Sequence, residues 1–429
     1  TTLKGQYRLS LSAEGTYDSV AQTFPKVAAD MELSDGFIKT AEFPESLQQF
    51  HLKSLVSNST GKMTDTRIEV SDFSFVLDEE PFSGRLVLTN PADYTWDFAA
   101  DGGVDLNKMT HIFPIEGMQL AGIIRGNLVS AGKLSDLEAE RYNQIPTSGD
   151  FEIKDFSYTS SDLPYPFQIR SGQASFTPQQ ISLTQVKAET GSTDLGINGV
   201  LTNYINYLFS ENETIVGTID LESNKVDLNE WMTETEPTAG QETSSVLEIP
   251  TGVEMSLQAR AGTVLYDNMT LNNVKGEVHL KDGVAQMKNL SFNSLGGGFL
   301  VNGSYDPRDL KHPKFSMDVD MQQVGFKEAF NTFNTVKVLA PVAQFIDGDF
   351  STTLDLNGEL EPDMMPNLST IAGKGLVNIA AATLSGNDSK LVRGFSELTQ
   401  FKAAPKEFLL KDVIMAIKIQ DGQMDVAPF

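Results

Sequence analysis

The sequence contains no cysteine among its 429 residues, so disulfide bonds and thiolate metal sites are excluded. Without cysteine, the sequence carries no signal for a redox compartment. Its longest apolar stretch, residues 338–346, is interrupted by Pro341 and is far shorter than the roughly 18 residues that a membrane-spanning helix needs. The first ten residues are polar and strand-like, which does not fit a signal peptide. The beginning and the end are both abrupt, which indicates a fragment of a longer protein.

Histidine is scarce, and the residue patterns of known enzyme sites are missing. His51, His111, His279 and His312 lie far apart, and none has the spacing of metal ligands. The glycine run at residues 296–298 precedes a strand rather than a helix, so it does not form a phosphate-binding loop. Carboxylates alternate with apolar residues, as on a solvated strand face. We therefore predict no catalytic residue, no metal and no cofactor, and a protein that is not an enzyme.

Positive charge is also scarce. The chain has 32 Lys and Arg against 58 Asp and Glu, which gives a formal net charge of −26. Nucleic acids and anionic membrane surfaces both need basic patches on a protein partner. The charge therefore predicts that the protein does not bind nucleic acid.

Strand patterns fill most of the chain. In residues 315–321, Phe, Met, Val and Met stand at every second position and alternate with Ser, Asp and Asp. A period of two places the apolar residues on one face of a strand. Helical patterns are few, at residues 325–346 and 389–401. The sequence predicts a mostly β protein with long antiparallel meanders and a few short amphipathic helices.

The chain repeats itself. A strand that contains a key glycine recurs at Gly84, Gly199 and Gly303, and the last two follow an asparagine. The first and third of these glycines occupy equivalent positions in two successive larger repeat units. Each larger unit has about 220 residues, and the chain holds nearly two of them. We predict a first repeat region at residues 1–232 and a second at residues 249–429. We expect the intervening residues 233–248 to form an acidic flexible linker or loop, because residues 233–245 are low in complexity and lack large apolar side chains.

One strand changes its apolar phase. Between residues 67 and 77, Ile68 and Val70 occupy even positions, whereas Phe73, Phe75 and Leu77 occupy odd positions. A slip of one residue turns a side chain to the other face of a sheet. We therefore expect a β-bulge or bend near Asp72.

The apolar strand faces need a cover. A second sheet would bury them in a sandwich, and the residues alone favour this because most alternating sheets bury one face on protein. The other interpretation is a sheet curled into a trough whose inner face holds acyl chains. In an open trough, Met317→Glu should leave the fold intact and reduce lipid binding, whereas Ser316→Glu should change little. The candidate groove residues are Phe73, Phe75, Leu77, Leu86, Leu88, Val278, Leu280, Phe315, Met317, Val319 and Met321.

Residues 373–423 resemble the C-terminal region of the AsmA-like family of bacterial envelope proteins, the AsmA/TamB type. The stretch has a Gly-x-Gly strand at Gly373, a turn of small residues, a predicted helix with the run Phe-Ser-Glu-Leu from Phe395, and a strand that ends in a polar-Gly turn at Gly422. The run from Leu356 to Leu360 is also typical of the family. The repeats extend the resemblance over most of residues 65–429.

The resemblance implies a fold and a function. Family members are similar to bridge-type lipid-transfer proteins, in which a long, repeated antiparallel sheet is bent into an open, taco-like hydrophobic groove. It implies a periplasmic body anchored in the bacterial inner membrane by an N-terminal helix, which this chain lacks. The expected partners are phospholipid or another acyl lipid, the inner membrane through that anchor, and envelope proteins.

The sequence leaves two functions open. The first is a non-enzymatic periplasmic segment that binds or transports lipid on the apolar face of the groove and supports phospholipid traffic and outer-membrane biogenesis. The alternative is a structural or adhesive β-sandwich protein of the cell envelope that binds glycan or protein through its loops. Co-purified phospholipid would distinguish the first from the second.

Overall fold

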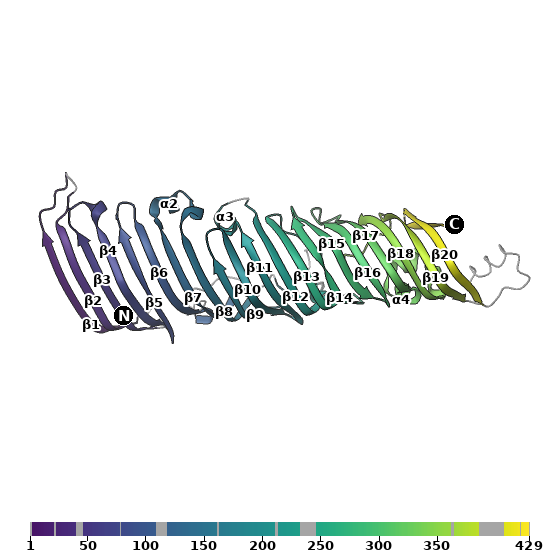
Figure 1. Cartoon of the computed structure of the whole chain (residues 1–429), viewed down its shortest axis with the longest axis horizontal. Helices are drawn as coiled ribbons and strands as arrows, with labels where there is room; N and C mark the ends of the chain where they lie inside the picture. Colours follow the sequence, from purple (N-terminus) through teal and green to yellow (C-terminus); the bar gives the residue numbers. More distant parts are fainter. Residues whose placement is uncertain are drawn as a thin grey trace, which may run out of the picture. The chain divides into compact units, whose positions relative to one another are not determined.

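The protein is mostly β, and its 21 strands belong to a single open sheet with a few short helices (Figure 1). The computed structural model describes residues 2–428 except 21–22, 40–45, 78, 109–117, 161–162, 211–212, 232–245, 362–363, 386–406 and 421. The prediction of a mostly β protein with a long, bent antiparallel sheet is confirmed. The described residues form one sheet, so they lack the second sheet that a sandwich requires.

The first of two units comprises residues 1–191 and 196–216. Each strand from β1 to β9 pairs antiparallel with the next one along the chain. Short helical turns lie in the connections at η1 (Met63–Asp65), α2 (Leu134–Glu138), η2 (Tyr142–Gln144) and α3 (Tyr204–Phe209). The strands are β1 (Thr2–Glu14), β2 (Lys26–Lys39), β3 (Leu47–Asn58), β4 (Arg67–Leu77), β5 (Glu80–Thr89), β6 (Thr95–Asp105), β7 (Met118–Lys133), β8 (Thr147–Ser160), β9 (Phe167–Phe176), β10 (Gln180–Thr190) and β11 (Thr193–Thr202).

The second unit comprises residues 192–195 and 217–429. From β13 onward each strand again pairs antiparallel with its successor. The strands are β12 (Ile215–Asp227), β13 (Val253–Tyr266), β14 (Met269–Lys281), β15 (Val284–Ser294), β16 (Gly297–Asp306), β17 (Lys314–Gly325), β18 (Ile346–Glu359), β19 (Ala372–Ser385), β20 (Glu407–Gln420) and β21 (Gln423–Pro428). The helical turns are η3 (Leu228–Trp231), α4 (Phe326–Thr332), α5 (Asn334–Leu339) and η4 (Pro341–Phe345).

The helical turns α4, α5 and η4 occupy the stretch where the sequence predicts a partly helical region, residues 325–346. The other predicted helix, residues 389–401, lies outside the described residues, as does most of the acidic segment 233–248. The division into residues 1–232 and 249–429 stays a prediction.

The expected bulge in β4 is present. Val70 lies opposite Leu86 of β5 and Phe73 lies opposite Gly84, so β4 has one residue more than β5 between these pairs. Because of the extra residue, Val70 and Phe73 point to the same face, although Val70 occupies an even position in the sequence and Phe73 an odd one. Ile68, Val70, Phe73, Phe75 and Leu77 therefore lie on one side of the sheet, and Val76 lies on the other.

Other bulges explain why asparagine precedes two of the repeated glycines. The bulge residue Asn289 has φ of 51°, and its N–H donates a hydrogen bond to Oδ1 of Asn302 at 2.8 Å. Gln185 has φ of 52°, and its N–H donates to Oδ1 of Asn198, also at 2.8 Å. A bulge leaves one residue out of the strand ladder. The repeated asparagines supply the acceptor that the ladder no longer provides.

Candidate functional site

One face of the sheet in the first unit is apolar across ten strands, and we call it the first apolar face. All five candidate residues from this unit lie in cross-strand pairs on it, and Leu77 lies opposite Leu47 of β3. Phe73 lies opposite Gly84, Leu86 opposite Phe98 of β6, and Leu88 opposite Trp96. The longest cross-strand row is Tyr7, Leu33, Leu52, Phe73, Gly84, Ala100, Leu128, Gly149, Phe176 and Ile181.

A second row beside it is built from aromatic rings and glycines. Phe75 lies opposite Phe82, and their ring centroids are 5.0 Å apart with an interplanar angle of 15°. The Phe82 ring covers Gly102 so closely that a Cβ atom at that position would collide with it. The row continues through Gly126 to Phe151. The glycines thus provide space in which aromatic rings lie flat along the sheet.

The side chains of β4 and β5 on the first apolar face are half-buried. Phe73, Phe75 and Leu77 of β4 all have intermediate exposure, and so do Leu86 and Leu88 of β5. The described residues form three clusters of buried apolar side chains, and all three lie in the second unit. The described part of the first unit thus has no such cluster, although single apolar side chains such as Val186 and Ala188 are buried there.

The second unit has an apolar face of the same construction, the second apolar face. All six candidate residues of this unit share it. Val278 and Met317 stand in one row, and Leu280 and Phe315 stand in the next. The first of these rows is Leu257, Val278, Met287, Gly303, Met317, Leu356, Gly373, Ile419 and Met424.

Part of the second apolar face is covered by the chain itself. Phe315 is 8% exposed and forms a buried cluster with Ile371 and Ile419, against which Met317 and Leu339 of α5 pack. On the same strand, Met321 packs against a cluster that contains Ala329 of α4. Val278 and Leu280 on β14 are half-buried and belong to none of the three clusters. The candidate residues therefore differ in their cover, which the alternation of the sequence did not indicate.

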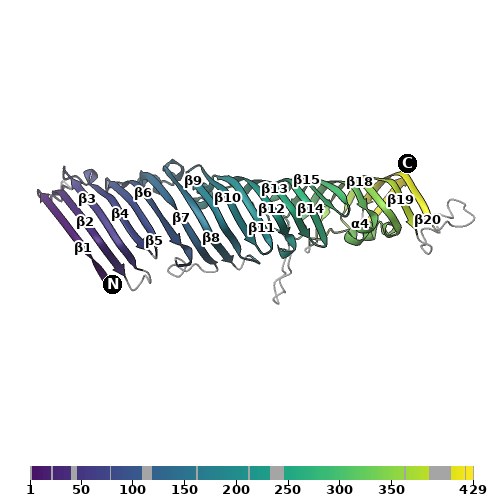
Figure 2. The ribbon, with the colours of Figure 1, turned by 60° about the horizontal axis from the view of Figure 1, so that its bottom comes forward.

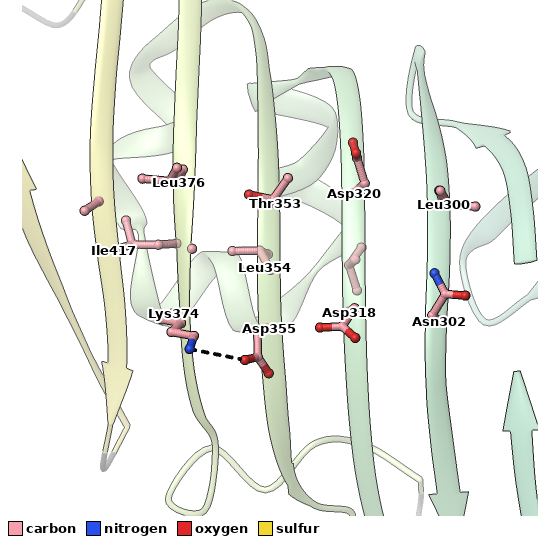
Figure 3. Close-up of a pocket in the computed structure, with 13 residues that line it drawn as sticks. Leu300, Asn302, Asp318, Asp320, Thr353, Leu354, Asp355, Lys374, Leu376 and Ile417 are labelled. Carbon is pink, nitrogen blue, oxygen red and sulfur yellow. Dashed lines mark ion pairs between the residues drawn. The ribbon is translucent and has the colours of Figure 1, made fainter. Parts of the chain in front are cut away.

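The opposite face of the sheet is polar and carries two hollows. One, of about 520 Å³, is lined by Asp318, Asp320, Thr353, Asp355 and Lys374, together with apolar side chains such as Leu300 (Figure 3). Nζ of Lys374 lies 3.7 Å from Oδ2 of Asp355. Asp318 and Asp320 alternate with the apolar residues of β17, so this hollow lies on the side away from the apolar face.

The other hollow, of about 530 Å³ in the first unit, contains an ion pair that the sequence did not indicate. Nε of Arg125 donates a hydrogen bond to Oε2 of Glu80 at 2.8 Å, although the two residues are 45 positions apart. The hydrogen bond from Arg125 lowers the pKa of Glu80, and burial opposes this less strongly. Asp101, Asp150 and Glu152 line the same hollow. Glu80 is thus an ionised structural partner rather than an acid that donates protons near neutral pH.

Two other groups have a shifted pKa for structural reasons. Burial raises the pKa of Tyr305 to about 12, and its hydroxyl donates a hydrogen bond to the carbonyl oxygen of Leu247 at 3.0 Å. Burial also favours a higher pKa for Asp194, but hydrogen bonds from the backbone N–H groups of Lys225 and Asn224 and from side chains lower it overall. One of these side-chain donors is Oγ of Ser223, which lies 3.2 Å from Oδ1 of Asp194.

The described residues contain no group of three or more His, Asp or Glu side chains arranged to hold a metal ion. They also contain no helix that combines the length and the apolar character of a membrane span. The main chemical feature of the described structure is therefore the pair of apolar faces. No protein-family model, no curated protein and no solved structure matches this chain.

Proposed function

We propose that this chain is a non-enzymatic lipid-binding segment that holds acyl chains on the first apolar face and on the uncovered part of the second. The observation that carries the proposal is the row of apolar and glycine residues that crosses ten consecutive strands without a charged side chain. Its residues in β4 and β5 are half-buried and Tyr7 of β1 is 60% exposed, so they keep surface that an apolar ligand would remove from water.

Acyl chains suit this surface better than a polar ligand does. Burying a methylene group contributes roughly 0.8 kcal/mol, so about ten of them contribute on the order of 8 kcal/mol, which corresponds to micromolar affinity. These contacts have no preferred direction. A lipid held by them is free to slide along the rows, because no polar side chain in the row fixes its position.

The resemblance to the AsmA-like family supplies the biological setting of the proposal. In that setting, the chain is the periplasmic part of a protein anchored in the bacterial inner membrane. It supports phospholipid traffic and outer-membrane biogenesis, with phospholipid and envelope proteins as partners. The polar face, with its ion pairs such as Arg85–Asp97, would face water while lipid occupies the apolar face.

The test is extraction of the purified protein and identification of bound phospholipid by mass spectrometry. Phe75→Glu places a carboxylate on the first apolar face, and Ser74→Glu places the same group on the polar face of the same strand. We expect the wild type and Ser74→Glu to carry phospholipid and Phe75→Glu to carry much less at a similar thermal midpoint. Repeated extracts of the wild type without lipid would instead favour the structural or adhesive alternative.

A further inference from the structure

The stretch of residues 326–345, which we call the covering segment, is one part of the chain that lies on the second apolar face. It consists of α4, α5 and η4, and α4 lies against one side of the sheet in this unit (Figure 2). Phe326 and Ala329 of α4 are 8% and 1% exposed. Phe330 packs against the buried cluster that contains Phe326, and Phe333 packs against the cluster that contains Ala329. The segment is therefore bound to the sheet through an apolar surface of its own.

The surface under the covering segment continues the pattern of the uncovered faces. Its central cross-strand row is Phe299, Met321, Thr352, Val377 and Met415. In β4 and β5 of the first unit, the residues of such rows stay half-buried, whereas here the covering segment provides the cover. The packing of the covering segment thus shows that this surface binds a narrow, mostly apolar group.

Few polar interactions hold the covering segment in place. The helices have seven, six and five residues, and none has a side-chain hydrogen bond at its N-cap. Helices of this length are not stable without tertiary contacts. The ion pair between Lys327 and Asp347, at 3.1 Å, joins two exposed side chains, and such pairs contribute little. Apolar contact is therefore the main force that keeps the segment on the sheet.

One buried polar atom under the segment lacks a partner. Thr352 is 5% exposed, and its Oγ1 has no hydrogen-bond partner among the described residues. It stands between Met321 and Val377, which pack against the two clusters that include α4. An unpaired buried hydroxyl destabilises the closed arrangement. The ester or headgroup oxygens of a lipid would give this hydroxyl a partner that the covering segment does not.

We infer that the covering segment occupies a further acyl-chain site, lined by Phe299, Phe350, Val377 and Met415 and including Thr352, and that acyl chains compete with it for this surface. The inference rests on the proposed function, since it assigns a second location to the same ligand class. The site is closed when the segment is docked and becomes available when the segment lifts. A ligand that binds only the open form shifts the population toward it.

The experiment labels the protein with a phosphatidylcholine that carries a diazirine in one acyl chain, and locates the adducts by peptide mass spectrometry. Phe330→Ala/Phe333→Ala weakens docking of the covering segment without changing the sheet. Val338→Ala is the matched control, because Val338 belongs to the same segment and is 57% exposed. The sequence has no cysteine, so Lys327→Cys/Asp347→Cys bridged by a short bismaleimide locks the segment down selectively.

We expect labelling of β18–β20 peptides to rise about tenfold in the double alanine variant, to stay at the wild-type level in Val338→Ala, and to disappear in the bridged protein. Labelling of β4–β6 peptides should be the same in all four proteins. Equal labelling of β18–β20 in the bridged and double alanine proteins, with normal labelling of β4–β6, would overturn this inference alone. No labelling of either region in any protein would overturn the proposed function as well.

Discussion

Asp194 is a single carboxylate that fastens neighbouring backbone in the second unit. It accepts hydrogen bonds from the N–H of Lys225 at 2.8 Å, from the N–H of Asn224 at 3.0 Å and from Nδ2 of Asn224 at 2.7 Å. These donors favour the ionised form and lower its pKa despite burial. Its contribution to stability is thus tied to its charge.

The lowered pKa of Asp194 predicts a pH dependence. Its contribution is present above the unfolded-state pKa of about 3.9 and is lost as the pH falls through the lower folded value. We expect Asp194→Asn to lower the free energy of unfolding by about 1 kcal/mol at pH 7, and by less at pH 3. Urea unfolding at both pH values measures the difference. The same loss at both would show that the charge of Asp194 plays no part.

The repeated asparagines allow a second prediction at this scale. Asn302→Ala removes the acceptor of the Asn289 N–H, and Asn198→Ala removes that of the Gln185 N–H. Because these bulge donors are outside the strand ladder, each substitution should cost about 1 kcal/mol in urea unfolding. Asn302→Asp keeps an acceptor oxygen and should cost less. If the alanine and aspartate variants are equally stable, water replaces the side chain at the bulge.

At the scale of elements, substitutions in β17 show how a covered part of an apolar face differs in stability from an uncovered part. The sequence predicts that Met317→Glu keeps the fold, but Met317 packs against the buried cluster of Phe315, and Leu339 of the covering segment packs against the same cluster. Met317 is half-buried, so a carboxylate in its place would be partly removed from water by this cluster. We now expect a loss of about 3 kcal/mol for Met317→Glu and little change for Ser316→Glu on the polar face.

Thermal midpoints of these two variants, measured beside Phe75→Glu, check the prediction. Phe75 lies on the first apolar face, where the charged group has access to water. Phe75→Glu should therefore be more stable than Met317→Glu, the other variant with a carboxylate on an apolar face. A midpoint for Met317→Glu as high as that of Phe75→Glu would mean that the covering segment does not restrict this position.

Which residues form strands, and which side chains share one face of a strand, could be predicted from the sequence. Which parts of an apolar face are covered by other segments of the chain could not. The alternation in β17 and the phase slip in β4 report local geometry, because neighbouring residues determine which face a side chain takes. The pattern of Phe326, Ala329 and Phe330 likewise predicts a helix with an apolar side. It does not reveal which sheet surface that side contacts. The Glu80–Arg125 pair also depends on strands distant in the sequence, so no local pattern indicates it.

At the scale of the whole molecule, the net charge of −26 affects stability independently of any single contact. Excess like charge destabilises a folded chain by self-repulsion, and salt screens this because the Debye length falls from about 30 Å at 0.01 M to about 8 Å at 0.15 M. We expect the thermal midpoint to rise when sodium chloride is raised over this range. A falling midpoint would mean that exposed ion pairs such as Arg170–Glu189 outweigh the repulsion.

Pairing between consecutive strands has a consequence for how each unit folds. A hairpin formed by two successive strands closes only a short loop, so its entropic cost is small, and any hairpin provides an edge on which the next strand docks. Folding should therefore begin at several hairpins and spread by addition of single strands. Backbone amides of β5 and β6, with a neighbour on either side, should exchange with deuterium much more slowly than those of β1, which pairs only with β2 and is exposed at all thirteen of its residues.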